Sequence, residues 1–134
     1  MIEIDGDSHG QPDLPLHPPP SSAKSTLSLE RAILRRGSSR AFKRFPITLD
    51  QFATLLDRSV RPIRTDDRRG AALAAPYLIV NAAEGLEPGV YRVVERDREP
   101  RLSMQTIRLG VLRAQAAHLA LKLDLAGGAV FNIY

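Results

Sequence analysis

SLERAILRRGSSRAF, residues 28–42, contains the point at which a helical pattern gives way to an extended one. Its apolar residues recur at helical spacing, which predicts a short amphipathic helix from Leu29 to Arg36. Gly37 follows directly, and glycine in a left-handed conformation commonly closes a helix. The pattern therefore predicts a helix that delivers the residues after Gly37 to a fixed place in the fold.

Three side chains around this helix end could act together on one anion. Arg36 and Arg40 are four positions apart, with the hydroxyl of Ser38 midway between them. Two guanidiniums and a hydroxyl can give charge-assisted hydrogen bonds to several oxygens of one phosphate monoester, as in a nucleotide or a flavin. The alternative is that these arginines only complement the dipole of the helix end.

A second helix is predicted to begin at Leu49. Thr48 and Gln51 have the spacing of a capping box, and Ile47 precedes it as an apolar staple for Phe52. The following apolar residues recur at helical spacing and predict a buried face. That face consists of Leu49, Phe52, Ala53, Leu56 and Val60.

Downstream, the strand patterns are Tyr77 to Ala82, Val90 to Glu95 and Arg101 to Gln105, with glycines and a proline between the first two. Tyr77 and Tyr91 are interpreted as structural. A last helix is expected over Thr106 to Leu125, apolar on two faces and so covered on both sides. His118 in it and the leader histidines His9 and His17 are assigned no catalytic or metal-binding role.

Three segments occur in the order SLERAILRRGSSRAF (28–42), FPITLDQF (45–52) and YLIVNAAEGLEPGVY (77–91). The first two resemble the opening of the FMN-dependent nitroreductase family. The third resembles the branch with SagB-type dehydrogenases, which mature thiazole- and oxazole-bearing peptides. The leader, from Leu14-Pro15-Leu16 to Pro18-Pro19-Pro20, also fits that branch.

This resemblance implies an α+β fold in which helices pack on a mostly antiparallel sheet. It also implies that Arg36, Ser38 and Arg40 bind the phosphate of FMN, and that the protein is a homodimer with flavin at its interface. The stretch from Gly70 to Pro76 departs from the family, because it lacks the hydroxyl groups expected beside the flavin ring.

The 134 residues allow one domain. Residues 1–26, rich in proline and serine, are expected to form a flexible leader outside the core. Residues 27–134 are then the N-terminal portion of a nitroreductase-like domain. Family members are longer, and the sequence ends in AVFNIY (129–134), which reads as a strand with nothing after it. The chain is therefore expected to be either the front portion of a longer enzyme or a naturally shortened relative, with a missing C-terminal half or a second copy as its partner.

Composition narrows the functional classes. The chain has no cysteine, which excludes disulfides, thiol catalysis and cysteine-ligated metals. It has no signal sequence and no apolar run of about twenty residues, so a cytoplasmic protein without membrane contact is expected. Residues 28–70 hold eleven basic and five acidic side chains, which fits either an anionic partner or a solvated basic face without a specific partner.

Three functions stay open at this stage. The first is an FMN-dependent oxidoreductase of the nitroreductase type, with a small molecule or an azoline ring in a modified peptide as substrate and no catalytic residue assigned. The second is a non-catalytic module that keeps the fold for dimerisation or peptide binding. Nucleic-acid binding is the third and weakest, because aromatic residues make up only 5% of the chain and do not alternate with the arginines.

Overall fold

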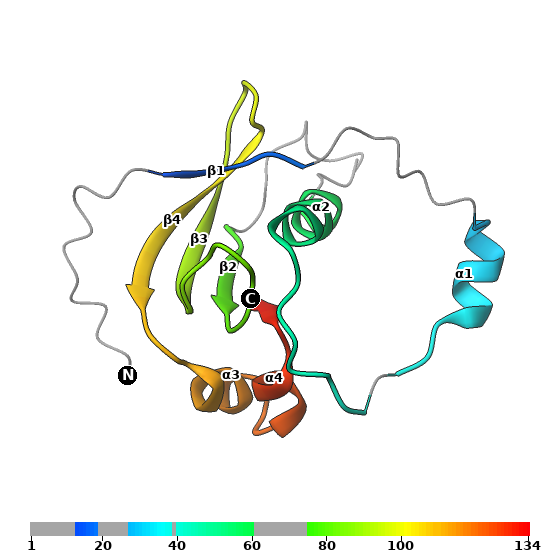
Figure 1. The fold of residues 1–134 in the computed structure, drawn as a ribbon. Helices are drawn as coiled ribbons and strands as arrows, with labels where there is room; N and C mark the ends of the chain where they lie inside the picture. Colours follow the sequence, from blue (N-terminus) through cyan, green and yellow to red (C-terminus); the bar gives the residue numbers. More distant parts are fainter. Residues whose placement is uncertain (1–12, 19–26, 39, 61–74) are drawn as a thin grey trace, which may run out of the picture.

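A computed structural model describes residues 13–18, 27–38, 40–60 and 75–134. In these residues one antiparallel sheet has the strand order β1-β4-β3-β2-β5 (Figure 1). The strands are β1 (Leu14–Leu16), β2 (Tyr77–Val80), β3 (Gly89–Glu95), β4 (Leu102–Leu109) and β5 (Phe131–Ile133). The helices are α1 (Leu29–Arg35), α2 (Leu49–Ser59), α3 (Arg113–Leu119) and α4 (Asp124–Gly128). The predicted α+β class is confirmed.

Strands β2, β3 and β4 form the centre of the sheet. Leu78 of β2 lies opposite Tyr91 of β3, which in turn lies opposite Thr106 of β4. Alternate residues of β2 point to opposite faces, so Leu78 and Val80 join one apolar cluster and Ile79 joins the other. The three predicted strands are present, and β4 runs four residues further than expected.

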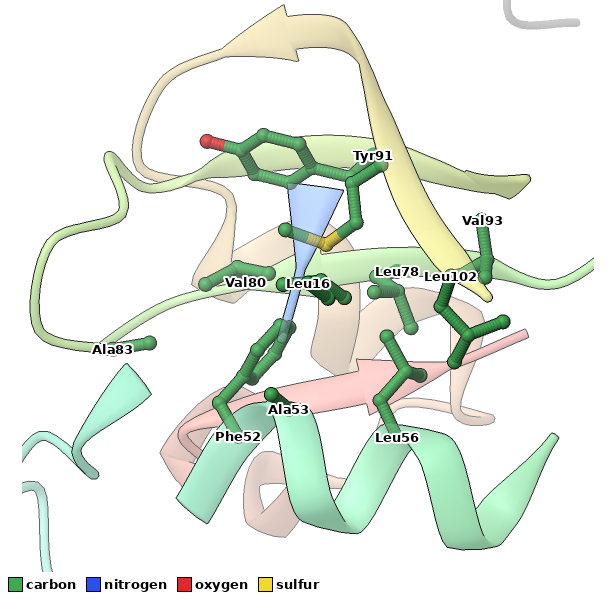
Figure 2. Packing of buried hydrophobic residues seen from close by; sticks show 11 residues of the cluster. Leu16, Phe52, Ala53, Leu56, Leu78, Val80, Ala83, Tyr91, Val93 and Leu102 are labelled. Carbon is green, nitrogen blue, oxygen red and sulfur yellow. The ribbon is translucent and has the colours of Figure 1, made fainter. Parts of the chain in front are cut away.

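The larger apolar cluster lies between α2 and the sheet (Figure 2). Phe52 and Leu56 of α2 are completely buried there. The ring of Phe52 meets that of Phe131 edge to face, with centroids 5.0 Å apart, which ties β5 to the helix. The sheet contributes Leu16, Leu78, Val80, Tyr91, Val93, Leu102 and Met104.

The predicted start of α2 is confirmed in detail. The Gln51 amide donates to the Thr48 hydroxyl oxygen (3.2 Å), and the Thr48 amide donates to the Gln51 side-chain oxygen (3.1 Å). These two bonds satisfy amides that the first helical turn leaves free. Ile47, just before the cap, packs against the core cluster as expected of a staple.

The predicted helix over Thr106 to Leu125 is wrong. Its first residues continue β4, and Gly110 then takes a positive φ of 143° that only glycine adopts without strain. Helix α3 begins at Arg113 and ends at Leu119, and α4 follows after a turn. The two apolar faces of the predicted helix arose because residues of a strand, up to Leu109, and of a short helix, from Arg113, were read as one helix. Within the described residues, none of the helices is long and apolar enough to span a bilayer.

Helix α3 covers the face of the sheet opposite α2. Ala116 is completely buried and Leu112 nearly so, and both pack with Ile79 and the partly buried Val90. The side chain of Tyr134 links this helix to the sheet edge, because its hydroxyl donates to the Ala116 carbonyl at 3.0 Å. His118 is exposed.

Part of the expected leader joins the core. Strand β1 pairs antiparallel with β4, with Leu14 opposite Met104 and Leu16 opposite Leu102. Leu16 is only 3% exposed and belongs to the larger apolar cluster. Composition suggested a solvated leader, but one leucine with a well-placed partner strand is enough to bring this short piece into the fold.

Candidate cofactor-binding segment

Helix α1 is held by its own backbone and its N-cap. The Arg31 amide donates to the Ser28 hydroxyl oxygen at 3.3 Å. At the other end, Arg36 is extended (φ −64°, ψ 125°), and its amide donates to the carbonyls of Ala32 and Ile33. The expected left-handed cap at Gly37 is wrong, because the chain leaves the helix at Arg36 and Gly37 has no positive φ.

None of the residues of α1 is buried. Leu29, Ile33 and Leu34 are 78%, 63% and 79% exposed, although leucine and isoleucine are usually interior residues. In Figure 1, α1 lies well apart from the sheet and from α2. The chain rejoins the domain at Ile47, whose carbonyl accepts from the Glu84 amide at 2.9 Å.

We call residues 28–38 and 40–46 the arm. After α1 it continues without regular secondary structure and exposes two aromatic side chains, Phe42 (45%) and Phe45 (74%). Ser39 lies outside the described residues. The arm thus combines solvent-exposed apolar groups with a high density of arginine.

The predicted phosphate-binding residues Arg36, Ser38 and Arg40 all lie on this arm and are exposed. Among the described residues, their side chains have no hydrogen-bond or ion-pair partner. An added Cβ at Gly37 would meet nothing within 4 Å, so the backbone between them is open. Their joint binding of one phosphate stays a prediction, and unpaired guanidiniums and a free hydroxyl are the donors that it requires.

Two arginines of the β3–β4 hairpin, Arg96 and Arg101, are in contrast paired. Arg101 donates to the Asp57 carboxylate from two nitrogens (3.0 and 3.3 Å) and to the Glu95 carboxylate at 3.0 Å. Arg96 donates to the Asp13 carboxylate and, at 3.0 Å, to the Ser103 hydroxyl. Sequence reasoning missed these clusters, because their members are up to 83 positions apart and no local spacing marks them.

The tyrosines support the structural interpretation. Tyr91 is 1% exposed, and its hydroxyl donates to the Glu87 carbonyl at 2.6 Å. Burial, with a smaller contribution from the Glu87 charge, raises the pKa of Tyr91 above 10.0. A phenol with such a pKa is protonated at neutral pH, so Tyr91 is not a general base there. Tyr77 is 41% exposed and pairs its backbone with Tyr134.

Of the stretch expected beside a flavin ring, Gly70 to Ala74 lie outside the described residues. Asn81, directly after β2, is 7% exposed, and its side-chain nitrogen donates to the Ala129 carbonyl at 3.0 Å. Its side-chain oxygen has no partner in the described part of the chain. This amide ties the end of β2 to the end of α4.

Comparison with known proteins gives a likeness of fold. No family model matches this sequence. No curated protein matches it either. Among solved structures, a protein provisionally named a nitroreductase, from Anabaena variabilis ATCC 29413, superposes with a TM-score of 0.56 and 23% sequence identity over 74% of this chain. The fold is nitroreductase-like.

The superposition confirms the fold that the sequence resemblance implied. This nitroreductase-like chain spans 21% of the length of the Anabaena protein. At 23% identity the likeness is one of architecture, and it does not distinguish the SagB-type branch from others.

Proposed function

We propose that this protein is an FMN-dependent oxidoreductase of the nitroreductase type, in which Arg36, Ser38 and Arg40 bind the FMN phosphate. The nitroreductase-like fold supports the reaction class. The observation that carries the proposal is the arm itself, since all three side chains are exposed on one short segment and have no partner among the described residues.

The donor set fits a phosphate and not a neutral ligand. Each guanidinium presents a planar fork of N–H donors that remains charged at all physiological pH values. Ser38 adds a hydroxyl donor between them. When bound, FMN supplies hydride-transfer chemistry, while these residues fix its phosphate end and thereby its position. Azoline rings in modified peptides and small nitroaromatics or quinones are the candidate substrates.

We further propose that the protein is a homodimer in which the arm packs on the second copy. A short helix is not stable in water by itself, and burial of an apolar face normally supplies the missing stability. Within this chain Ile33 and Leu34 gain no such burial. A partner surface that covered these side chains would also bring the neighbouring arginines to an interface, where a phosphate is partly shielded from water.

Equilibrium binding of FMN to the purified chain tests the cofactor proposal. Arg36→Ala and Arg40→Ala should each weaken binding roughly tenfold to a hundredfold, because each removes one set of charge-assisted hydrogen bonds. Arg98→Ala is the matched control: Arg98 is also exposed, lies on the β3–β4 turn and should leave affinity unchanged. Equal affinities of all four proteins would overturn the phosphate site.

Light scattering of the chain and of Ile33→Asp tests the assembly. We expect a dimer for the wild type and a monomer for the variant, because a carboxylate cannot be buried unpaired at an interface. Leu121→Asp, at a leucine that is 90% exposed in the α3–α4 turn, is the control and should remain dimeric. A monomeric wild type at high concentration contradicts the proposal.

The alternative is a non-catalytic module that keeps the fold for dimerisation or peptide binding. The absence of hydroxyl side chains between Gly70 and Pro76 favours it. A stable dimer that binds no FMN would support this alternative over the oxidoreductase.

A further inference from the structure

Ser38 differs from the other exposed serines of the described residues. The hydroxyl of Ser28 accepts from the Arg31 amide at the start of α1, and that of Ser59 donates to the Leu55 carbonyl at 2.7 Å at the end of α2. The Ser38 side chain is exposed and has no hydrogen-bond partner among the described residues. Its hydroxyl is therefore free to accept a transferred group.

The backbone before Ser38 is extended and open. Arg36 has φ −64° and ψ 125°, and Gly37, which follows it, has no positive φ. A Cβ added at Gly37 would meet nothing within 4 Å. The preceding helix α1 lies apart from the sheet and from α2 (Figure 1). Because phosphoryl transfer needs the attacking oxygen in line with the phosphorus and its leaving oxygen, an enzyme must surround the acceptor hydroxyl, and this segment leaves room for that.

Two cations precede this hydroxyl at fixed spacing. Arg35 and Arg36 lie three and two positions before Ser38, and both are exposed. Their side chains have no ion pair within the part of the chain that the structure describes. A protein kinase with carboxylates along its peptide groove gains affinity from both guanidiniums, and such charge patterns are a general means by which kinases choose substrates. Ser28 and Ser59 have no basic residue at these two positions.

We propose that Ser38 is a phosphorylation site for a protein kinase that selects arginine three and two positions before the acceptor, and that the phosphate on Ser38 then blocks FMN. The co-reactant is a nucleoside triphosphate. The Ser38 Oγ forms a bond to the γ-phosphorus, the bond from that phosphorus to the leaving nucleoside diphosphate breaks, and the hydroxyl proton goes to a carboxylate of the kinase. The effect on FMN rests on the function proposed above, whereas the modification itself does not.

A phosphate on Ser38 competes with the FMN phosphate for the same two cations. It carries a charge of about −1.5 to −2 at neutral pH and has three acceptor oxygens. Residues two apart in an extended chain point to the same side and lie about 7 Å apart, a distance that an arginine side chain can span. Arg36 and Arg40, on either side of Ser38 in the sequence, can therefore bind it. The same modification removes the Ser38 hydroxyl as a donor to FMN and repels the incoming phosphate.

Phosphorylation of the full chain in vitro tests the site. The probe is ATP with a serine kinase that prefers arginine at these two positions, on dilute protein so that a second copy does not cover the arm, and mass spectrometry locates the phosphate. Ser38 should be modified and Ser28 should not. Arg35→Ala should lower the initial rate roughly tenfold or more, since it removes one ion pair with the kinase. Arg31→Ala, at an exposed arginine seven positions before Ser38, is the matched control and should leave the rate unchanged.

An unmodified Ser38, or equal rates for Arg35→Ala and the wild type, would overturn the phosphorylation site.

The FMN affinity of the phosphorylated protein tests the competition. It should be roughly tenfold lower, or less, than that of the unmodified protein, and saturating FMN should slow the phosphorylation of Ser38, because two events that exclude each other do so reciprocally. Riboflavin, which has no phosphate, is the control and should bind both forms equally. Arg35→Ala keeps the three FMN-binding side chains and should bind FMN like the wild type.

The outcomes separate this inference from the function on which it rests. Unchanged FMN affinity after phosphorylation, in a protein whose FMN binding is weakened by Arg36→Ala, would overturn the competition alone. FMN binding that Arg36→Ala leaves unchanged would overturn the phosphate site and the competition together, while the mass spectrum would still decide the modification.

Discussion

The β3–β4 hairpin and the arm use the same residue types with opposite outcomes. In the hairpin, Arg101 and Arg96 are each bound to carboxylates, and Leu102, next to Arg101, is buried. In the arm, Arg36 and Arg40 have no partner among the described residues, and Ile33 is exposed. Arg96 and Arg101 are thus paired within the chain, whereas the arm has groups available for a second molecule.

Substitutions of apolar side chains should give the largest difference in stability between the domain core and the arm. Phe52→Ala removes a completely buried ring and should lower the free energy of unfolding by about 3–5 kcal/mol. Ile33→Ala, on the arm, should change it by less than about 0.5 kcal/mol when measured on dilute, monomeric protein. Urea denaturation followed by circular dichroism measures both. A similar loss of unfolding free energy in Phe52→Ala and Ile33→Ala would contradict the difference between the core and the arm.

Two glycines give the next largest difference. A Cβ at Gly89 would lie 2.5 Å from the Arg108 carbonyl oxygen on the paired strand, so Gly89→Ala must push β3 and β4 apart. We expect a loss of about 1–3 kcal/mol. Gly37→Ala on the arm meets nothing and should be neutral or slightly stabilising. The thermal unfolding temperatures distinguish the two variants. A Gly89→Ala protein that unfolds at the wild-type temperature would contradict the close approach of β3 and β4 at this position.

The arginines should differ by a smaller amount. Arg101→Ala removes several hydrogen bonds that join the hairpin to α2 and should cost about 1–2 kcal/mol of unfolding free energy. Arg36→Ala should cost nothing measurable. Arg101→Lys keeps the charge but loses the two-nitrogen contact with Asp57, so its stability should fall between the wild type and Arg101→Ala. Equal stability of Arg101→Ala and Arg36→Ala contradicts the pairing.

Tyr91→Phe should have the smallest effect, about 1 kcal/mol at neutral pH, through loss of the hydrogen bond to Glu87. The pKa of Tyr91 is raised in the folded protein, so the stability linked to its proton is present below pH 10.0 and lost as pH rises through the raised value. Wild-type stability should therefore fall more steeply above that pH than the stability of Tyr91→Phe. Denaturation at mildly and strongly alkaline pH measures the difference.

The sequence predicted elements whose signals are local. The capping box of Thr48 and Gln51 placed the start of α2 to the residue, since both of its bonds join neighbours. Helix α1 ended within one residue of its expected end, while its cap at Gly37 was wrong. Strands β2 and β3 were also predicted, because β-branched residues and the turn glycines between them mark them locally.

Elements that depend on distant partners were missed. Apolar and polar residues alternate only weakly at the start of the stretch from Thr106 to Leu125, and only pairing with β3 shows that these first residues form a strand. Strand β1 depends on Leu16 reaching the larger apolar cluster and on Asp13 reaching Arg96, contacts that no composition rule contains. The exposure of Arg36, Ser38 and Arg40 fits the sequence-based hypothesis, while their joint action on a phosphate stays a prediction.

The most direct measurement is the affinity of the chain for FMN relative to riboflavin, which has the same ring system without the phosphate. If Arg36, Ser38 and Arg40 bind the phosphate, the wild type should prefer FMN by roughly tenfold or more, and Arg36→Ala combined with Arg40→Ala should bind both flavins equally. Equal affinity of the wild type for the two flavins, or a preference that survives in the double variant, would contradict the account.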